Sequence, residues 1–267
     1  MSADLPKFVP MWFSFGRVHA YLLEDEEGLT LIDALADDQG KTIFSTITSM
    51  GRQPKDLRRI ILTHGHPTHV KGAAVLKEAS GAPVFAPIEE QDIIEGRRPS
   101  NRTTLIPHQP FRVLPQQYLL NLQNYLWKLG IRPAIMNVNP VKVDRQITSD
   151  FERIGPVITF RTPGHSPGST SFYWPATATL FTGDILVTWP KLELGWRGLT
   201  ENVAMNLASV RRLVAVFEAR GWPIHRFASG HGSPYITEDG IADFKRLLTQ
   251  AGMPQPEKGP LTSPAPC

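Results

Sequence analysis

The chain is poor in cysteine: among its 267 residues the single cysteine is Cys267, the last residue. One thiol cannot form an intramolecular disulfide, and a thiol at the chain end offers no cluster of thiolates for a soft metal and no nucleophile within a folded site. The sequence therefore predicts chemistry that does not depend on sulfur.

Long apolar runs and a strong charge imbalance are also lacking. No stretch approaches the roughly 18 apolar residues that a membrane span needs, and residues 1–7 lack the basic-then-apolar order of a secretory signal. The formal net charge is only +3, whereas a nucleic-acid surface needs clustered Lys and Arg. We therefore expect a cytoplasmic protein with no nucleic-acid partner and no membrane partner.

The apolar residues alternate between strand and helix periods along the chain, which is typical of an α/β protein. Short strands are predicted at residues 20–24, 29–33, 59–63, 83–86, 157–160, 169–174, 179–182 and 226–228. Helices are predicted at residues 38–50, 67–80, 202–220 and 241–250. The first two strands are separated by a short polar turn and read as a hairpin.

Two segments depart from this pattern. Residues 88–143 are rich in Pro, Arg and Asn around one amphipathic segment, 114–129. That segment could wall an apolar pocket, or it could pack on the rest of the chain or on a second subunit of a homodimer. Residues 253–267 contain five prolines and few apolar side chains, so we expect a disordered tail.

Five of the eight histidines lie in three short segments, each just after a predicted strand. The segments are 63–69, with His64, His66 and His69; 162–168, with His165; and 229–233, with His231. A fourth segment, 181–184, places the carboxylate of Asp184 in the same context. Imidazole and carboxylate ligands suit zinc, iron or manganese, and the neighbouring glycines allow sharp turns that let such ligands converge.

Simpler interpretations exist for some of these residues. His165 or His231 alone would more often be a surface or core histidine, and Asp184 could be a turn residue. The triplet in the first segment is harder to explain in this way, because three imidazoles within six residues at the end of a buried strand pack poorly without a metal. The remaining histidines, His19, His108 and His225, have no such context, and we expect them to be structural.

Taken together, the four segments resemble the metallo-β-lactamase superfamily, whose signature His-x-His-x-Asp-His is followed by three isolated metal ligands. The resemblance extends from the hairpin ending at Asp33 to the helix after His231, with matching order and approximate spacing. It implies an α/β fold, the four-layer αβ/βα sandwich, with the metals in a groove at one edge of its two sheets. We expect one such domain over residues 1–252, with a helical or loop insertion at about 88–143.

The resemblance also implies which residues hold the metals. The implied ligands are His64, His66 and His165 for a first metal and His69 and His231 for a second, with Asp184 bridging both. Asp33 resembles a common family aspartate behind the ligands, where a carboxylate can fix the tautomer of a ligating imidazole. The implied cofactor is one or two Zn²⁺ ions, with iron or manganese as alternatives.

Thr68 departs from the family pattern, which has aspartate here as a ligand of the second metal and as a proton carrier. Threonine is neutral and a poor ligand, so three outcomes are open: a mononuclear enzyme, two metals with Thr68 hydrogen-bonded to the bridging hydroxide, or metal binding without catalysis. Two histidines, Asp184 and a water could still complete a four-coordinate zinc site. Asp184 and Thr68 are the candidate catalytic residues.

The sequence thus predicts a hydrolase in which metal-bound hydroxide attacks a carbonyl or phosphorus centre of a small molecule. Without the motif aspartate a proton donor to the leaving group is missing, so an ester, lactone or thioester fits better than an amide. Two other classes remain open. One is a mononuclear iron dioxygenase of the same fold, using His64, His165 and Asp184, and the other is a catalytically silent metal- or ligand-binding protein.

Overall fold

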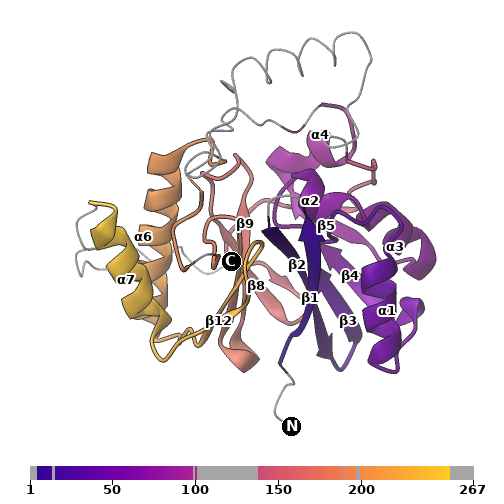
Figure 1. The fold of residues 1–267 in the computed structure, drawn as a ribbon, viewed down its shortest axis with the longest axis horizontal. Coiled ribbons are helices and arrows are strands. Elements are labelled where there is room, and N and C mark those ends of the chain that lie inside the picture. The colour runs from indigo at the N-terminus through magenta and orange to yellow at the C-terminus, as the bar shows by residue number, and fades with distance from the viewer. Residues whose placement is uncertain are drawn as a thin grey trace.

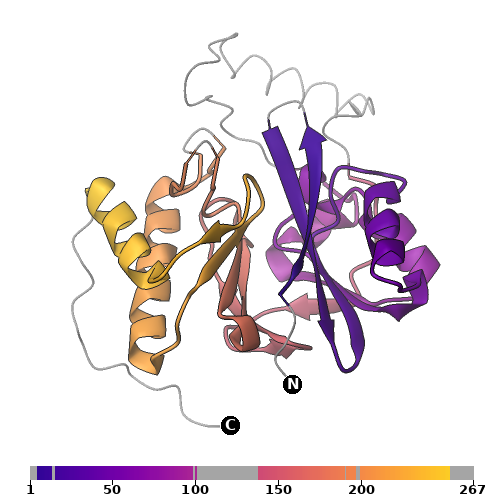
Figure 2. The ribbon, with the colours of Figure 1, turned by 60° about the horizontal axis from the view of Figure 1, so that its bottom comes forward.

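Two six-stranded sheets lie face to face in the computed structural model of the protein, with helices on the outer face of each (Figure 1). The structure describes residues 5–13, 16–98, 100, 138–189, 191–196 and 199–252. The amphipathic segment 114–129, His108 and the tail 253–267 lie outside the described residues. The two sheets and their helices form the α/β four-layer sandwich that the sequence predicted, and Figure 2 shows the same layers from a second direction.

The first sheet has the order β1-β2-β3-β4-β5-β6, antiparallel from β1 to β3 and parallel from β3 to β6. Its strands are β1 Lys7–Phe13, β2 Gly16–Asp25, β3 Gly28–Ile32, β4 Leu57–Ile61, β5 Val84–Pro87 and β6 Arg145–Ile147. The helices of this half are α1 Lys41–Ser49, η1 Pro54–Asp56, α2 Pro67–Val70, α3 Ala73–Ser80, η2 Ile88–Glu90 and α4 Gln91–Ile94.

The second sheet has the order β12-β11-β10-β9-β8-β7 and is antiparallel except for the parallel pair β10 and β11. Its strands are β7 Arg153–Ile154, β8 Val157–Arg161, β9 Thr170–Trp174, β10 Thr179–Gly183, β11 Arg226–Ser229 and β12 Tyr235–Ile236. The helices of this half are η4 Pro175–Thr177, α6 Val203–Arg220 and α7 Gly240–Gln250.

Strand β2 contributes side chains to two hydrophobic clusters, one on each face of the first sheet. Val18, Ala20 and Leu22 pack into the cluster beneath α1 and α3, whereas Tyr21 and Leu23 join a cluster drawn from both sheets. Successive side chains of a strand point to opposite faces of the sheet. A sheet covered on both sides therefore needs successive apolar residues in the buried part of its strands, and β2 has them from Ala20 to Leu23.

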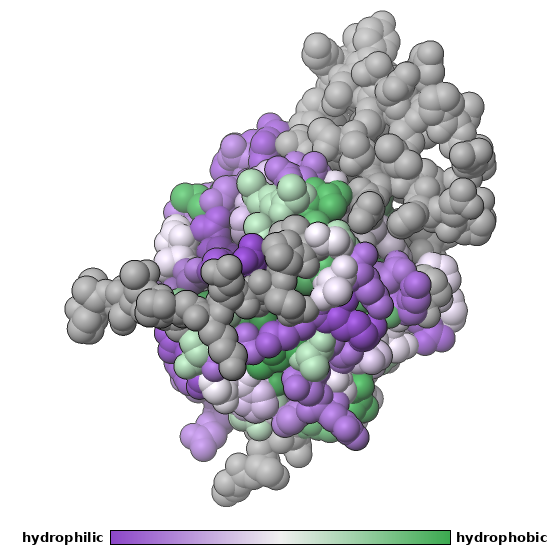
Figure 3. Space-filling view, turned by 90° about the vertical axis from the view of Figure 1, so that its left-hand side faces the viewer, coloured by the Kyte–Doolittle hydropathy of each residue, from purple (hydrophilic) through white to green (hydrophobic). Residues whose placement is uncertain are grey.

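The outer helices of the second half are fixed by N-terminal caps. The side chain of Asn202 accepts a hydrogen bond from the backbone N–H of Met205 at the start of α6. Asp239 caps α7 in the same way, by accepting from the N–H groups of Ile241 and Ala242. Both helices pack their buried residues on the second sheet, and hydrophilic and hydrophobic residues are interspersed on the face that they turn outward (Figure 3).

Several elements differ from the sequence predictions. The predicted helix 67–80 is divided into two helices, α2 and α3, with a turn at Lys71 and Gly72 between them. This turn packs closely on the chain after β3, since a Cβ at Gly72 would lie 2.3 Å from the carbonyl oxygen of Ala34. Helix α1 begins at Lys41 rather than residue 38, since Gly40 adopts a left-handed conformation with φ of 64°. Strands β1, β6, β7 and β12 were not predicted. Within the described residues, no helix is long and apolar enough to cross a membrane.

Candidate metal centre

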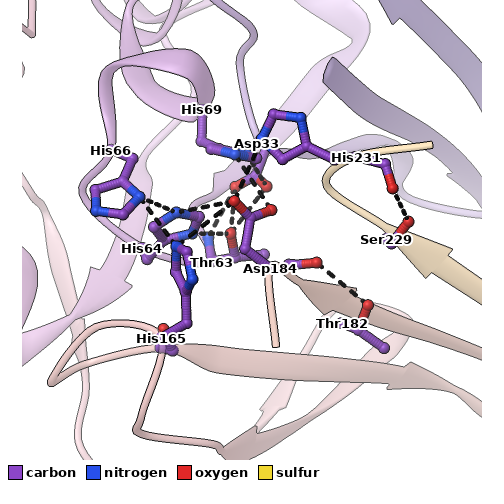
Figure 4. Close-up of polar contacts among 12 residues, drawn as sticks. Asp33, Thr63, His64, His66, His69, His165, Thr182, Asp184, Ser229 and His231 are labelled. Atoms are coloured by element: carbon purple, nitrogen blue, oxygen red, sulfur yellow. Dashed lines mark hydrogen bonds and ion pairs between the residues drawn. The ribbon is translucent and has the colours of Figure 1, made fainter. Parts of the chain in front are cut away.

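The site lies where strands of both sheets end. Asp33 follows β3, His64 and His66 follow β4, His165 follows β8, Asp184 follows β10, and His231 follows β11. Residues that follow such strands meet at one edge of the sandwich, which is where open α/β sheets commonly place their ligand sites. Figure 4 shows the imidazoles of His64, His66 and His165 to the left of Asp184, with His69 and His231 above it.

The first group consists of His64, His66, His165 and Asp184, all buried. The Nδ1 atom of His66 is 3.0 Å from Nε2 of His64 and 3.0 Å from Nε2 of His165. The Oδ2 atom of Asp184 is 3.8 Å from Nε2 of His64 and 3.5 Å from Nε2 of His165. Ligand atoms of a tetrahedral zinc ion lie about 3.3 Å apart, so the four side chains fit one metal ion.

The second group consists of His69, Asp184 and His231. The Nε2 atom of His69 is 3.5 Å from Oδ1 of Asp184, and the Nε2 atom of His231 is 3.3 Å from Oδ2. Within the described part of the chain, Nε2 of His69 and Oδ1 of Asp184 are buried without a hydrogen-bond partner. Buried polar atoms without partners are costly, and a cation between them would satisfy both.

Asp33 connects the ligands of the two groups. Its Oδ2 lies 2.9 Å from Nδ1 of His69, and its Oδ1 accepts a hydrogen bond of 2.8 Å from the N–H of Thr63. The hydroxyl of Thr63 lies 2.9 Å from Nδ1 of His64. In the neutral form of His69, an Nδ1–H that donates to Asp33 leaves Nε2 as the lone-pair atom that faces Asp184, which is the arrangement expected of a carboxylate behind a ligating imidazole.

The protonation of these groups follows from burial and charge. Burial lowers the pKa of His64 well below its usual value, and the neighbouring His69 lowers it further, so this imidazole is neutral and able to act as a ligand. Burial also disfavours a charged His69, but the carboxylates of Asp184 and Asp33 outweigh it and raise the pKa of His69 to about 10. Burial opposes ionisation of Asp184, yet His231 and His69 hold its pKa well below the usual range.

A proton therefore occupies the second group when no metal is bound. His69 is cationic at neutral pH between two carboxylates, and a metal that binds its Nε2 must displace that proton. Metal binding at this group consequently releases a proton and weakens as the pH falls.

His231 is held by the edge of the first sheet. The Nδ1 atom of His231 lies 3.1 Å from the carbonyl oxygen of Arg17, and the backbone of His231 forms an antiparallel β-bridge with Val18 of β2. An Nδ1–H donated to that carbonyl directs Nε2 toward Asp184. The indole of Trp196 packs against the imidazole in a tilted arrangement, with ring centroids 4.9 Å apart, and so adds a second contact that limits the movement of the ring.

Glycine is required at position 230 because two of the candidate ligands approach its backbone. A Cβ at Gly230 would lie 2.2 Å from Oδ1 of Asp184 and 2.6 Å from Cε1 of His69. The segment before His231 therefore packs directly on the second group, and a larger residue would have to displace one of these side chains.

The structure brings together all six side chains that the resemblance implied as ligands, with Asp33 beside His69. Thr68 lies in α2, next to His69, and is buried with 8% of its surface exposed. His66 and His231 have the same exposure, while His69 has none. Thr68 is therefore buried to the same degree as two of the candidate ligands and is the chain neighbour of a third.

Two residues near the centre were not singled out from the sequence. His19, which we expected to be structural, is fully buried on β2 and packs against Phe8, with ring centroids 4.4 Å apart. Burial, with the nearby His231, lowers the pKa of His19 to about 3. Glu90 is also fully buried and lies at the end of η2, in the segment assigned to an insertion. No local sequence pattern marks either residue.

Comparison with known proteins gives consistent results. Residues 14–233 match the family model described as the metallo-β-lactamase superfamily. The chain is 30% identical over 168 residues to "Uncharacterized protein YobT" of Bacillus subtilis (strain 168), a match that covers 62% of this chain and 61% of the relative. It is 24% identical over 185 residues to "Probable metallo-hydrolase YybB" of the same organism, covering 69% of this chain and 66% of the relative. The matches thus span under two thirds of either relative's length.

Among solved structures, the fold is similar to that of the metallo-β-lactamase family protein TTHA1429 from Thermus thermophilus. The TM-score is 0.63 at 20% sequence identity, with 92% of this chain and 79% of that chain covered. At this identity the similarity concerns the fold alone. Since the family model spans most of the residues and the sandwich agrees with it, the chain belongs to the metallo-β-lactamase superfamily, whose members are mostly hydrolases.

Proposed function

We propose that the protein is a metal-dependent hydrolase of a small molecule, with His64, His66, His165 and Asp184 holding one metal and His69, Asp184 and His231 holding a second. The observation that carries this proposal is the convergence of the six side chains, in which Nε2 of His69 and Oδ1 of Asp184 have no hydrogen-bond partner among the described residues. Zinc suits this set of imidazoles and one carboxylate, with iron or manganese as alternatives.

When bound, the metal supplies a hydroxide nucleophile near neutral pH and polarises the bond to be cleaved. The chain's own residues prepare the site for this role. Asp33 orients His69, the carbonyl of Arg17 orients His231, and burial keeps His64 neutral. The absence of a carboxylate at position 68 leaves the second group with one anionic residue, Asp184.

Thr68 bears on the substrate class. A threonine hydroxyl can donate a hydrogen bond, but its pKa is too high for it to carry a proton as a carboxylate does. A substrate whose leaving group departs without protonation is therefore favoured, so the proposed substrates are esters, lactones or thioesters rather than amides.

The first experiment measures metal content and turnover of the same preparation. Purified protein is analysed for zinc, iron and manganese and assayed with an ester, a lactone, a thioester and a β-lactam. Zinc in both groups with hydrolysis of an oxygen or sulfur ester supports the proposal. Iron in the first group alone, with oxygen consumption, would support an iron dioxygenase instead, and full metal occupancy without turnover would support a binding protein.

The second experiment tests the role of position 68. Thr68→Asp adds the missing carboxylate, and Thr48→Asp, on the exposed face of α1, is the matched control. We expect Thr68→Asp to increase zinc affinity at the second group and to increase the rate with the β-lactam relative to that with the lactone. An unchanged or lower ratio of these rates would show that the proton donor is not what limits the substrate range.

A further inference from the structure

Glu90 lies between two of the segments that carry the candidate ligands of the first metal. Its side chain is fully buried, and both carboxylate oxygens accept hydrogen bonds from the backbone. Oε2 accepts from the N–H of Gly65 at 3.0 Å, and Oε1 accepts from the N–H of Gly168 at 2.8 Å. Gly65 separates His64 from His66, and Gly168 follows His165 by three residues.

The two glycines show how closely the carboxylate is enclosed. A Cβ at Gly65 would lie 2.9 Å from Oε2 of Glu90, and a Cβ at Gly168 would lie 2.6 Å from its Cγ. Neither glycine has a positive φ, so the backbone conformation does not require glycine at position 65 or 168. The absence of a side chain at both positions instead leaves the space that Glu90 fills.

These hydrogen bonds join the two halves of the sandwich. The segment with Gly65 follows β4 of the first sheet, and the segment with Gly168 connects β8 to β9 of the second. The backbone hydrogen bond from Thr170 to Thr63, 3.0 Å long, joins the same two segments. The separation of His66 from His165 therefore depends on contacts between two sheets, and Glu90 supplies two of them.

We propose that Glu90 is a positioning residue that sets the distance between the His64–His66 segment and the His165 segment, and so determines the affinity of the first metal. This inference rests on the proposed metal centre. A glutamine at position 90 would keep the shape, but its amide group would present N–H donors to one of the two backbone N–H groups. One of the two hydrogen bonds would be lost, and the segments would no longer be held at a single separation.

The test is a titration of metal-free protein with Co²⁺, whose absorption spectrum reports the number and geometry of its ligands. A His231→Ala background isolates the first group, and a His165→Ala background isolates the second. Glu90→Gln is compared in both backgrounds with Glu152→Gln. Glu152 is a suitable control because it also accepts two backbone hydrogen bonds, from Thr148 and Ser149 at 3.0 and 2.7 Å, but away from the site.

We expect Glu90→Gln to lower Co²⁺ affinity at the first group by about 10- to 100-fold, the usual effect of removing a residue that supports metal ligands, and to change the spectrum. Affinity at the second group should stay within about twofold, since Glu90 contacts neither the Asp184 segment nor the His231 segment, and its contact at Gly65 lies four residues before His69. In metal-free protein, amide hydrogen exchange at Gly65 or Gly168 should accelerate. Glu152→Gln should change none of these quantities.

The outcomes separate the inference from the proposed function. If the parent protein binds Co²⁺ and Glu90→Gln binds it with the same affinity and spectrum, Glu90 has no positioning role. Equal losses at both groups would also overturn the inference, because they indicate a general loss of structure. If Glu90→Gln does not fold, Gly168→Ala, which pushes on Cγ of Glu90, is expected to give the same selective loss. A parent protein that binds no metal refutes the proposed function itself.

Discussion

Replacing Asp33 by asparagine tests whether the residues behind the ligands control the metal. Asp33 is 2% exposed and has a φ of 58°, a left-handed conformation that asparagine tolerates well. The substitution therefore preserves backbone and shape, and removes only the negative charge and one acceptor oxygen. What changes is the hydrogen bond to Nδ1 of His69, 2.9 Å long, and those to Thr63.

The expected magnitude follows from these contacts. Loss of a carboxylate behind a ligating imidazole costs about 10- to 100-fold in metal affinity, or about 1.4–2.7 kcal/mol. In the metal-free protein, Asp33 is one of two carboxylates that raise the pKa of His69 to about 10, so the pKa of His69 should fall in the variant. The stability that protonated His69 confers is fully present below its unfolded pKa and lost as the pH rises toward 10. This dependence should weaken in Asp33→Asn.

The assay is zinc competition with a chromophoric chelator, together with urea unfolding of metal-free protein between about pH 6 and pH 10. Over this range His69 is protonated in the folded protein but loses its proton in the unfolded chain. Asp37→Asn is the control, because Asp37 also accepts backbone hydrogen bonds, from Gln39 and Thr42, but at the start of α1. We expect Asp33→Asn to lose affinity at the second group and Asp37→Asn to retain it. Zinc affinity equal to that of the parent protein in Asp33→Asn would refute the reasoning.

Three further substitutions test other parts of the structure. Gly230→Ala should lower zinc content at the second group, because its Cβ would lie 2.2 Å from Oδ1 of Asp184; full occupancy by elemental analysis would contradict this close packing. His19→Phe should reduce the loss of stability of metal-free protein at acid pH. The pKa of His19 is about 3 in the folded protein, so below pH 6.5 the unfolded chain binds a proton that the folded protein does not. This lowers the free energy of unfolding by about 1.4 kcal/mol per pH unit. An unchanged slope of unfolding free energy against pH would contradict it. Asn202→Ala should destabilise the protein by about 1 kcal/mol through loss of the α6 cap, measured by urea unfolding; a parent-like midpoint would show that the cap contributes nothing.

Much of the fold could be predicted because its signals are local. The hairpin of β2 and β3 is marked by an apolar alternation with a polar turn, and α6 and α7 by helical spacing after Asn202 and Asp239. Strand β1 was missed, since Lys7–Phe13 contains a proline and does not alternate. The single predicted helix at 67–80 was wrong, since it is divided at Lys71 and Gly72, and the helical spacing of the apolar residues does not show this division.

The sequence by itself determined the kind of site, because imidazoles and carboxylates placed after successive strands can be recognised without coordinates. It also showed the departure at Thr68, which is a matter of residue identity. Only the tertiary structure decided that Asp33 faces His69, that His69 is cationic when no metal is bound, and that Glu90 joins two distant segments. The reason is that these properties depend on distances between residues far apart in the chain, and on burial, which no local pattern contains.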